Sequence, residues 1–290
     1  MKTYCLAVLL VIFSAYNSLR IGGFMKKLLI SAVALLAAAA LFAGGKKEKD
    51  SKTITVGATP EPHAAILNLV VEDLAKEGYT LKVVEFTDYV TPNEAVESGQ
   101  IDANYFQHIP YMDSFNKEKG YHLVNVAGIH VEPLAVYSKK YTKLSDLPDG
   151  ATIAIPNDPT NEGRALLLLQ SAGLIKLDSN AGLTAVPLDI KENSKKFQFR
   201  EIEAASLPRT LDDFDASVIN GNYAIPAGLT ASKDGLFVEG KNSPYVNILT
   251  VKAGNEKSPA VQALIKALQS QKVKDFISKT YPNGEVVAVF

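Results

Sequence analysis

The chain has 290 residues and a formal net charge of −1, but its charges are unevenly distributed. The first 45 residues contain four basic and no acidic side chains, so residues 46–290 hold 26 basic and 31 acidic ones. The single cysteine, Cys5, also lies in the first part. Residues 46–290 therefore exclude a disulfide, a cysteine-ligated metal and a thiol nucleophile, and their mild acidity argues against nucleic acid as a partner.

The amino-terminal part has the pattern of an export signal. Two lysines after Met25 precede an apolar stretch over residues 28–42, small residues follow, and the sequence then becomes charged. The apolar stretch has about 15 residues, fewer than the roughly 20 that span a bilayer. We therefore interpret residues 1–45 as a leader, with an uncleaved anchor as the alternative and Met25 as a second candidate for the start of translation.

Bacterial lipoproteins carry an acylated cysteine directly after such a segment, but this chain has Gly44 and Gly45 there. Cys5 cannot substitute, because no apolar stretch precedes it. The sequence predicts an exported protein of the cell envelope, in the periplasm or anchored to a membrane, including the outer membrane. It leaves open whether a lipid or an uncleaved signal attaches the protein. Residues 46–52 are read as a charged tether.

From residue 53 onward, short apolar runs alternate with segments of helical spacing. Strand patterns cover residues 54–59, 81–86, 123–131, 134–138, 151–155, 185–190 and 216–219. Helical patterns cover residues 66–74, 92–99, 109–119, 160–172 and 206–213, and a closing helix starts at Ser258-Pro259. Alternating strands and helices predict an α/β fold with largely parallel sheets.

About 245 residues is near the size at which one hydrophobic core divides into two. We place two hinge crossings near residues 130–133 and 243–247. One lobe then comprises residues 53–132 and 248–290, and the other comprises residues 133–247. Such a two-lobed, periplasmic-binding-protein-like architecture suits either a ligand binder that closes about a hinge or an enzyme with a cleft, and the fold alone does not choose.

Motifs of the common enzyme classes are missing from the sequence. It has no nucleophile elbow, no zinc-protease helix and no phosphate-binding loop. The four histidines, His63, His108, His122 and His130, are not at metal-ligand spacing from one another. We therefore predict no catalytic residue, no metal and no cofactor. The acidic run at residues 212–215 is read as a solvated turn rather than an acid/base site.

Three segments carry polar groups that suit a small ligand. In residues 155–164 a strand ends and a helix begins, where Thr160 can cap the helix and free N–H groups favour an anion. Asn161 and Arg164 lie three residues apart on the first turn, and the fork of an arginine matches a carboxylate. The alternative is a surface arginine paired with Glu162 or another acid.

The second segment, residues 102–108, follows a predicted strand and combines Tyr105 and Phe106 with amides and His108. An apolar pocket with a few polar groups is typical of small-ligand sites, although the segment alone slightly favours the alternative, in which Tyr105 and Phe106 belong to the core and His108 is a satisfied hydrogen-bonding residue. The third segment, residues 218–223, contains Asn220, and Asn247 follows within a later apolar run. Amides can donate to a carboxylate and accept from an ammonium group, although an Asn-Gly pair alone more often marks a turn.

At these segments the sequence resembles the NlpA/MetQ family of methionine-binding lipoproteins, which are the substrate-binding subunits of ATP-driven methionine importers. The matching stretches are D-Y-V-T-P-N (88–93), D-A-N-Y-F-Q-H (102–108), A-I-P-N-D-P-T-N-E-G-R-A-L-L-L-L-Q (154–170), V-I-N-G-N-Y-A (218–224) and S-P-Y-V-N (243–247). Together they span about residues 53–290. The glycines at 44 and 45, where the family has its lipid-acceptor cysteine, are the departure from this pattern.

The resemblance implies that two α/β lobes close on L-methionine or a close analogue and deliver it to the permease/ATPase complex of an ABC-type importer. It implies eight ligand-binding side chains: Tyr89, Tyr105, Phe106, His108, Asn161, Arg164, Asn220 and Asn247. Arg164 would hold the carboxylate, the three asparagines would complete the polar shell, and the four rings would line the thioether pocket. The alternatives are a surface-exposed envelope protein with protein partners and, less favoured, an enzyme on the same fold.

Overall fold

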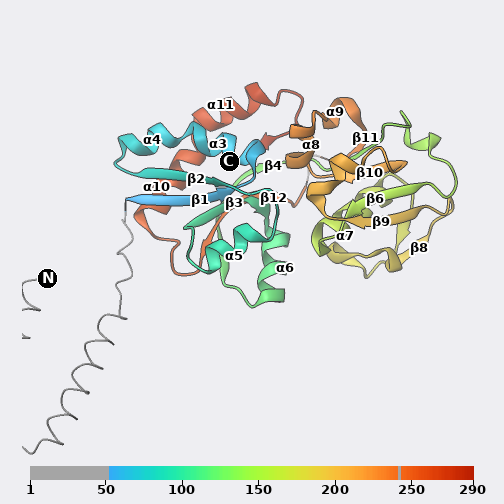
Figure 1. Cartoon of the computed structure of the whole chain (residues 1–290), viewed down its shortest axis with the longest axis horizontal. Coiled ribbons are helices and arrows are strands. Elements are labelled where there is room, and N and C mark those ends of the chain that lie inside the picture. Colours follow the sequence, from blue (N-terminus) through green and yellow to red (C-terminus); the bar gives the residue numbers. More distant parts are fainter. Residues whose placement is uncertain (1–51, 241–242) are drawn as a thin grey trace, which may run out of the picture. The chain divides into compact units, whose positions relative to one another are not determined.

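Two β-sheets covered by helices organise the protein in a computed structural model, which describes residues 52–240 and 243–290 (Figure 1). These residues belong to one compact unit. The predicted leader, residues 1–45, and nearly all of the predicted tether, residues 46–52, lie outside the described residues. Within the described part of the chain, no helix combines the length and apolar character that crossing a membrane requires.

The first sheet has six strands in the order β13-β4-β12-β3-β1-β2. Their bounds are β1 Thr53–Ala58, β2 Thr80–Glu85, β3 Ala103–His108, β4 Leu123–Val131, β12 Val246–Lys252 and β13 Val287–Ala288. β1 is parallel to β2 and β3, whereas β12 pairs antiparallel with both β3 and β4. Segments from the two ends of the described chain therefore build one sheet.

Helices pack on both faces of this sheet: α3 Ala65–Leu69, α4 Val71–Lys76, α5 Thr91–Glu97, α6 Ile109–Lys119, α10 Pro259–Leu268 and α11 Gln271–Thr280. The first two and last two share a hydrophobic cluster with the strands, to which Leu67, Leu264 and Ile277 contribute. α5 and α6 contribute Val96 and Met112 to a smaller cluster. Each such side chain contributes about 1.5–3 kcal/mol by leaving water, so the apolar faces of these helices fix them on the sheet.

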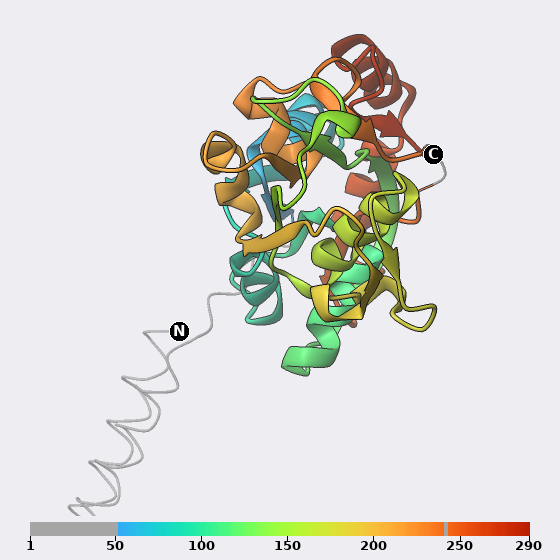
Figure 2. The same cartoon turned by 90° about the vertical axis from the view of Figure 1, so that its right-hand side faces the viewer.

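The second sheet has five strands in the order β11-β5-β10-β6-β9. Their bounds are β5 Ala135–Tyr137, β6 Thr152–Pro156, β9 Gln198–Ile202, β10 Ala216–Ile219 and β11 Gly235–Val238. Helices α7 Pro159–Ser171, α8 Gly221–Ala224 and α9 Ala231–Asp234 belong to this half, with a two-stranded ribbon of β7 Lys176–Leu177 and β8 Ile190–Glu192. In the view of Figure 2 this half lies toward the reader.

The chain passes between the two sheets twice, between β4 and β5 through Glu132 and Pro133, and between β11 and β12. The strand that follows the second passage, β12, lies directly between β3 and β4. Because β12 begins at Val246, Asn247 belongs to the first sheet. The bounds of the two lobes, residues 53–132 with 248–290 and residues 133–247, stay a prediction.

Most sequence-predicted elements are present, and residues 109–119 and 123–131 form α6 and β4 with the expected bounds. Two segments differ. The strand expected at residues 185–190 is a 3-10 turn, Pro187–Asp189, followed by β8, since proline lacks the N–H that a strand ladder needs. The helix expected at residues 206–213 is a 3-10 helix, Ala204–Thr210, which contains Pro208.

Residues 103–108, which we expected to follow a strand, form strand β3 itself. Every residue of β3 is buried, although three of the six are Asn104, Gln107 and His108. Asn104 and Gln107 form a hydrogen-bonded network with the side chain of Asn93 from α5. A buried strand whose polar groups are satisfied internally escapes a search for apolar runs, because that search counts only hydrophobic residues.

Candidate functional site

A pocket that encloses about 340 Å³ of empty space, part of it open solvent, lies between the half of the molecule built on the first sheet and the half built on the second. The residues that line it are Tyr89, Phe106, Gln107, His108, Tyr111, Glu132, Asn161, Arg164, Asn220, Gly221, Asn222 and Asn247. Seven of the eight side chains expected from the sequence are in this set. The eighth, Tyr105, is not.

Tyr105 faces the hydrophobic core rather than the pocket. Successive residues of a strand point to opposite faces, so Tyr105 joins the cluster beneath α3 while Phe106 packs with Tyr111 at the pocket. The Tyr105 hydroxyl bonds to Nδ1 of His130. Tyr105 was expected to line the thioether pocket, whereas in the structure it does not line this pocket and its ring lies in the core.

Helix α6 positions the aromatic side of the pocket. Its N-cap is His108, whose Nδ1 accepts the N–H of Tyr111 at 3.2 Å, and Gly120 ends it with a left-handed backbone. Because Nδ1 is an acceptor, Nε2 of the neutral ring carries the proton and faces Asn161 Oδ1 at 3.3 Å. Burial, and then the charge of Arg164, lowers the pKa of His108 to about 3. His108 is therefore a neutral N–H donor at physiological pH.

The rings of Tyr89, Phe106 and Tyr111 form the apolar wall. Tyr89 lies 5.8 Å from Phe106 and 5.9 Å from Tyr111, measured between ring centroids. The hydroxyl of Tyr111 donates to the backbone oxygen of Tyr89 at 2.9 Å, and the hydroxyl of Tyr89 donates to Oδ1 of Asn222 at 2.5 Å. Asn222 belongs to α8, so this bond joins the two halves of the pocket.

The start of helix α7 orients a chain of amide groups. Asp158, not Thr160 as expected, is the N-cap: its carboxylate accepts the backbone N–H of Asn161 at 3.0 Å. The same carboxylate accepts Nδ2 of Asn161, which leaves Asn161 Oδ1 to accept Nδ2 of Asn220 at 2.7 Å. A carboxylate only accepts, so Asn161 must present Nδ2 to Asp158 and Oδ1 to Asn220. Asn220 therefore donates through Nδ2, and its Oδ1 is left without a partner among the described residues.

Two buried amide atoms of the pocket have no hydrogen-bond partner within the described structure: Asn220 Oδ1 and Asn222 Nδ2. One is an acceptor and the other a donor. Leaving such a group unpaired costs about 1–3 kcal/mol, so the pair marks where a ligand would contribute the missing partners. A ligand that supplies a donor and an acceptor close together satisfies both.

Arg164 is buried, with 4% of its side chain exposed, and its fork is already occupied. Nε and Nη2 donate to the carboxylate oxygens of Glu239 at 3.0 and 2.5 Å, and Nη2 also donates to the backbone oxygen of Glu132 at 2.8 Å. The guanidinium lies 4.2 Å over the ring of Tyr245. Glu239 therefore occupies the Nε–Nη2 edge of the guanidinium, which can bind a carboxylate through two hydrogen bonds. The sequence had predicted that a ligand carboxylate would bind Arg164 in this way. Nη1 has no hydrogen-bond partner among the described residues.

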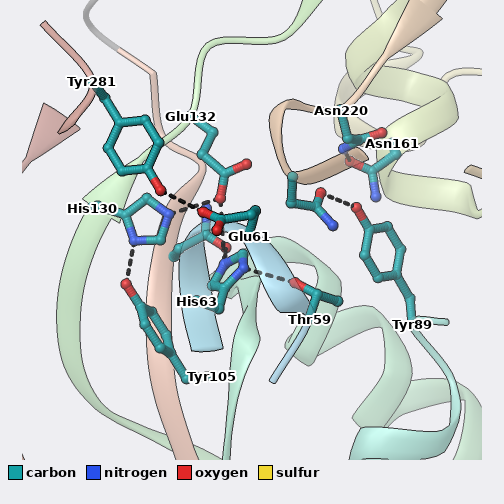
Figure 3. Close-up of polar contacts among 12 residues, drawn as sticks. Thr59, Glu61, His63, Tyr89, Tyr105, His130, Glu132, Asn161, Asn220 and Tyr281 are labelled. Atoms are coloured by element: carbon teal, nitrogen blue, oxygen red, sulfur yellow. Dashed lines mark hydrogen bonds and ion pairs between the residues drawn. The ribbon is translucent and has the colours of Figure 1, made fainter. Parts of the chain in front are cut away.

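Glu132 contributes a second charge to the pocket, and two histidines hold it (Figure 3). His130 Nε2 lies 2.7 Å and His63 Nε2 lies 3.3 Å from the same oxygen, Oε1. His63 also contacts Asn247 Oδ1 at 3.0 Å through Nε2 and Thr59 Oγ1 at 2.8 Å through Nδ1. Burial lowers the pKa of His63 to about 4 and that of His130 to about 3, and it raises the pKa of Glu132.

His63, His130 and Glu132 are also the one group within residues 52–240 and 243–290 whose ligand atoms lie close enough to hold a metal, all within 4.8 Å. Reasoning from sequence spacing missed this group, since 67 positions separate the histidines and only the fold brings them together. Every ring nitrogen has a side-chain partner, so hydrogen bonds satisfy the cluster as it stands.

Sequence reasoning also missed five residues that line the pocket, Gln107, Tyr111, Glu132, Gly221 and Asn222, and two that hold Arg164 from behind, Glu239 and Tyr245. Asn222 and Tyr245 lie inside segments that had been singled out, two positions from Asn220 and Asn247. Glu132 and Glu239 lie at the two passages between the sheets. The signal that the sequence offered for these two residues was an acidic side chain close to a predicted hinge crossing.

Two α/β halves joined by two passages, with a polar pocket between them, define a periplasmic-binding-protein-like fold, as the sequence predicts. The profile of the NlpA lipoprotein family matches residues 54–290, and the chain belongs to that family. The predicted family is thereby confirmed.

Known relatives cover nearly the whole described chain. The D-methionine-binding lipoprotein MetQ of Escherichia coli (strain K12) is 46% identical over 257 residues, which are 87% of this chain and 94% of that protein. The crystal structure of lipoprotein Tp32 from Treponema pallidum matches with a TM-score of 0.80 and 48% identity, and covers 82% of this chain and 99% of that one. A nutrient-binding protein from Burkholderia cenocepacia, solved bound to methionine, matches with a TM-score of 0.78 and 49% identity, over 82% and 100% of the two chains.

Proposed function

We propose that this protein is an extracytoplasmic solute-binding protein that captures methionine, or a close analogue, and delivers it to an ABC-type importer. Relatives at this level of identity are named for D-methionine binding, one solved relative holds methionine, and another is described as the periplasmic substrate-binding protein of an ABC transporter. The protein would act by binding alone, without catalysis. Its place would be the cell envelope, in the periplasm or attached to a membrane.

The observation that carries the proposal is the unpaired acceptor and donor in one buried pocket, Asn220 Oδ1 and Asn222 Nδ2. A free amino acid is a zwitterion, with an ammonium donor and a carboxylate acceptor on one carbon. It would supply both missing partners at once, which a neutral apolar ligand could not do.

The charges of the pocket support the same orientation. Glu132 lines the pocket beside two histidines whose pKa values are lowered, so its carboxylate is not neutralised by them and suits the ligand's ammonium group. Arg164 Nη1 and Asn222 Nδ2 would then hold the ligand's carboxylate, with Glu239 keeping the guanidinium in place. Hydrogen bonds to charged groups contribute about 1.5–3 kcal/mol each, so these contacts would dominate affinity.

The thioether of methionine would lie against Tyr89, Phe106 and Tyr111. Sulfur at the edge of an aromatic ring contributes about 0.3–1.5 kcal/mol, and a flexible, unbranched side chain can adapt to such a wall. His108, Asn161 and Asn247, which also line the pocket, would complete the set expected from the sequence. The lobes built around the two sheets would close on the ligand through the passages between β4 and β5 and between β11 and β12.

Calorimetry on protein that has been unfolded, stripped of ligand and refolded tests this proposal. We expect saturable binding of L- or D-methionine at one site per chain, and much weaker binding of glutamate, whose second carboxylate would enter the aromatic wall. Absence of a binding heat with either enantiomer and with methionine-containing dipeptides would contradict it. Turnover of the bound compound, followed by mass spectrometry, would favour the enzyme alternative instead.

A further inference from the structure

The Glu132 carboxylate is held on one side by imidazoles that come from two distant segments, the short helical turn Pro60–Ala64 after β1 and strand β4. We propose that His63 and His130 are positioning residues: their Nε2–H groups bind one oxygen of Glu132, which keeps this carboxylate ionised and presents it to the ammonium group of the bound amino acid. The inference rests on the proposed function.

The hydroxyl groups behind the histidines determine where the ring protons lie. Tyr105 and Thr59 each have one side-chain hydrogen-bond partner in the described structure, which is Nδ1 of a histidine. A hydroxyl that accepted from Nδ1 would leave its own buried hydrogen without a side-chain acceptor, so we assign each hydroxyl as the donor and that Nδ1 as the acceptor. In a neutral imidazole the other nitrogen then carries the hydrogen, so both Nε2 atoms are donors.

Both donors converge on a single acceptor atom. Oε1 of Glu132 receives His130 at 2.7 Å and His63 at 3.3 Å, and the second histidine shares its hydrogen with Oδ1 of Asn247 at 3.0 Å. A proton on this oxygen would clash with two N–H groups, whereas a carboxylate accepts both. Hydrogen bonds to the charged form favour that form, so the pair opposes the effect of burial on Glu132.

The remaining charged groups near Glu132 leave its charge available to the ligand. The nearest cation, Arg164, gives its two-bond face to Glu239. The other titratable groups that interact with Glu132 are hydroxyls that stay protonated: Tyr89, Tyr105 and Tyr281. Tyr281 is bonded to Glu61 at 2.6 Å, which adds a second negative group on the same side. The pocket thus lacks a full positive partner for Glu132, and an ammonium group would supply it.

The second oxygen of Glu132 points to the opposite half of the molecule. A Cβ added to Gly221, at the start of α8, would come within 2.7 Å of Oε2. Only glycine allows this approach, and Gly221 lies on the pocket wall. One oxygen is therefore bound by the two histidines of the first half, while the other lies against Gly221 at the start of α8 in the second half.

A pair of substitutions at one position separates the two bonds of His130. Glutamine in place of histidine can keep an N–H donor at the position of Nε2, facing Glu132. Asparagine can keep only the group near Nδ1, facing Tyr105. Both variants are polar and smaller than histidine, so His130→Gln and His130→Asn form a matched pair, and thermal unfolding establishes that both are folded. His63→Gln and His63→Asn repeat the comparison from the other segment.

Two probe ligands separate a positioning role from a merely structural one. L-Methionine has the ammonium group, whereas 4-(methylsulfanyl)butanoate has the same carboxylate and thioether without it. At pH 7 we expect His130→Asn to weaken methionine binding roughly tenfold to a hundredfold, with His130→Gln recovering most of the loss. The affinity for the butanoate should change less than about threefold in either variant. The pH below which methionine binding weakens should move upward in His130→Asn.

Equal losses for both ligands, or an unchanged pH profile, would overturn the inference and leave the histidines as structural residues. Stoichiometric zinc in the purified protein, with loss of methionine binding in EDTA, would also overturn it, because coordination would occupy both Nε2 atoms. If the unchanged protein binds neither probe, the proposed function fails and the inference falls with it. Methionine binding by the unchanged protein, without a difference between the variants, refutes the inference alone.

Discussion

Arg164 and Glu239 form a two-bond ion pair, at 3.0 and 2.5 Å, between the second turn of α7 and the passage that leads back to the first sheet. The same guanidinium donates to the backbone of Glu132, on the other passage. Arg164 therefore connects both passages, and a ligand that binds its free Nη1 would touch the point where the two halves are joined.

Replacing Arg164 by alanine should weaken methionine binding by about 2–5 kcal/mol, or thirtyfold to several thousandfold, because the buried carboxylate of the ligand would lose its cation. It should also destabilise the protein, since Glu239 is then left without its cation. The double variant Arg164→Met with Glu239→Gln should regain most of the stability but not the binding. Calorimetry and urea unfolding measure the two effects. Recovery of binding in the double variant would show that Arg164 has no direct contact with the ligand.

Replacing Asn222 by aspartate should abolish one specific contact while keeping the shape of the side chain. The oxygen that accepts from Tyr89 remains, but the unpaired Nδ2 donor becomes an acceptor. Loss of a hydrogen bond to the ligand's carboxylate should lower methionine affinity tenfold to a hundredfold, or about 1.5–3 kcal/mol, measured by calorimetry. Unchanged affinity would mean that the carboxylate lies elsewhere in the pocket.

Acid should destabilise the protein through its buried histidines. Burial lowers the pKa of His63 to about 4 and those of His108 and His130 to about 3. The unfolded chain takes up protons near pH 6.5, whereas the folded protein does so only near pH 3–4, so stability is lost as the pH falls through this window. Each group should cost up to about 2 kcal/mol between pH 7 and pH 5. Urea unfolding at both pH values measures the loss.

His122 provides the control for that experiment, because 74% of its side chain is exposed. His130→Gln should reduce the difference between pH 7 and pH 5, and His122→Asn serves as the comparison. An equal pH dependence in both variants would count against the buried histidines as its source.

Glu162 should act in the opposite direction. Burial, and then the charges of Glu201 and Asp158, raise its pKa to about 7. The folded protein therefore holds this proton more tightly than the unfolded chain, and the stability that the proton gives is present at low pH and is lost as the pH rises through 7. Water screens part of this effect, so Glu162→Gln should gain about 1–2 kcal/mol at pH 8 and little at pH 4. Urea unfolding of the variant and the unchanged protein measures the two stabilities. Equal stability of the two proteins at pH 8 would contradict the prediction.

The sequence predicted the α/β fold, most strands and helices, and seven of the pocket-lining residues, because those positions lie in local motifs. Side-chain direction was harder. Tyr105 and Phe106 are adjacent aromatic residues. They differ in direction only because β3 is pleated, so that Tyr105 points to the core and Phe106 to the pocket. Their roles could not be separated until residues 103–108 were known to be a strand.

Pairings between distant segments were beyond sequence reasoning. Arg164 was expected to offer its fork to a ligand, but Glu239, 75 positions away, occupies it. Likewise, His63 and His130 seemed scattered in the sequence. They come close only in the folded sheet, where β12 and β3 connect β4 to β1 and bring the end of β4 and the segment after β1 to the same edge. Contacts of this kind depend on topology, which a single sequence encodes without local signals.

The return of β12 to a position between β3 and β4 also sets an order of assembly. The five strands of the second sheet follow one another within residues 135–238, so that half can form while later residues are still arriving. The first sheet cannot close until residues 246–252 are available, and these bring Asn247 to the pocket. A chain that crosses a membrane amino-terminus first would therefore emerge with its first half open-edged, and would gain a complete binding site only in the last stage of translocation.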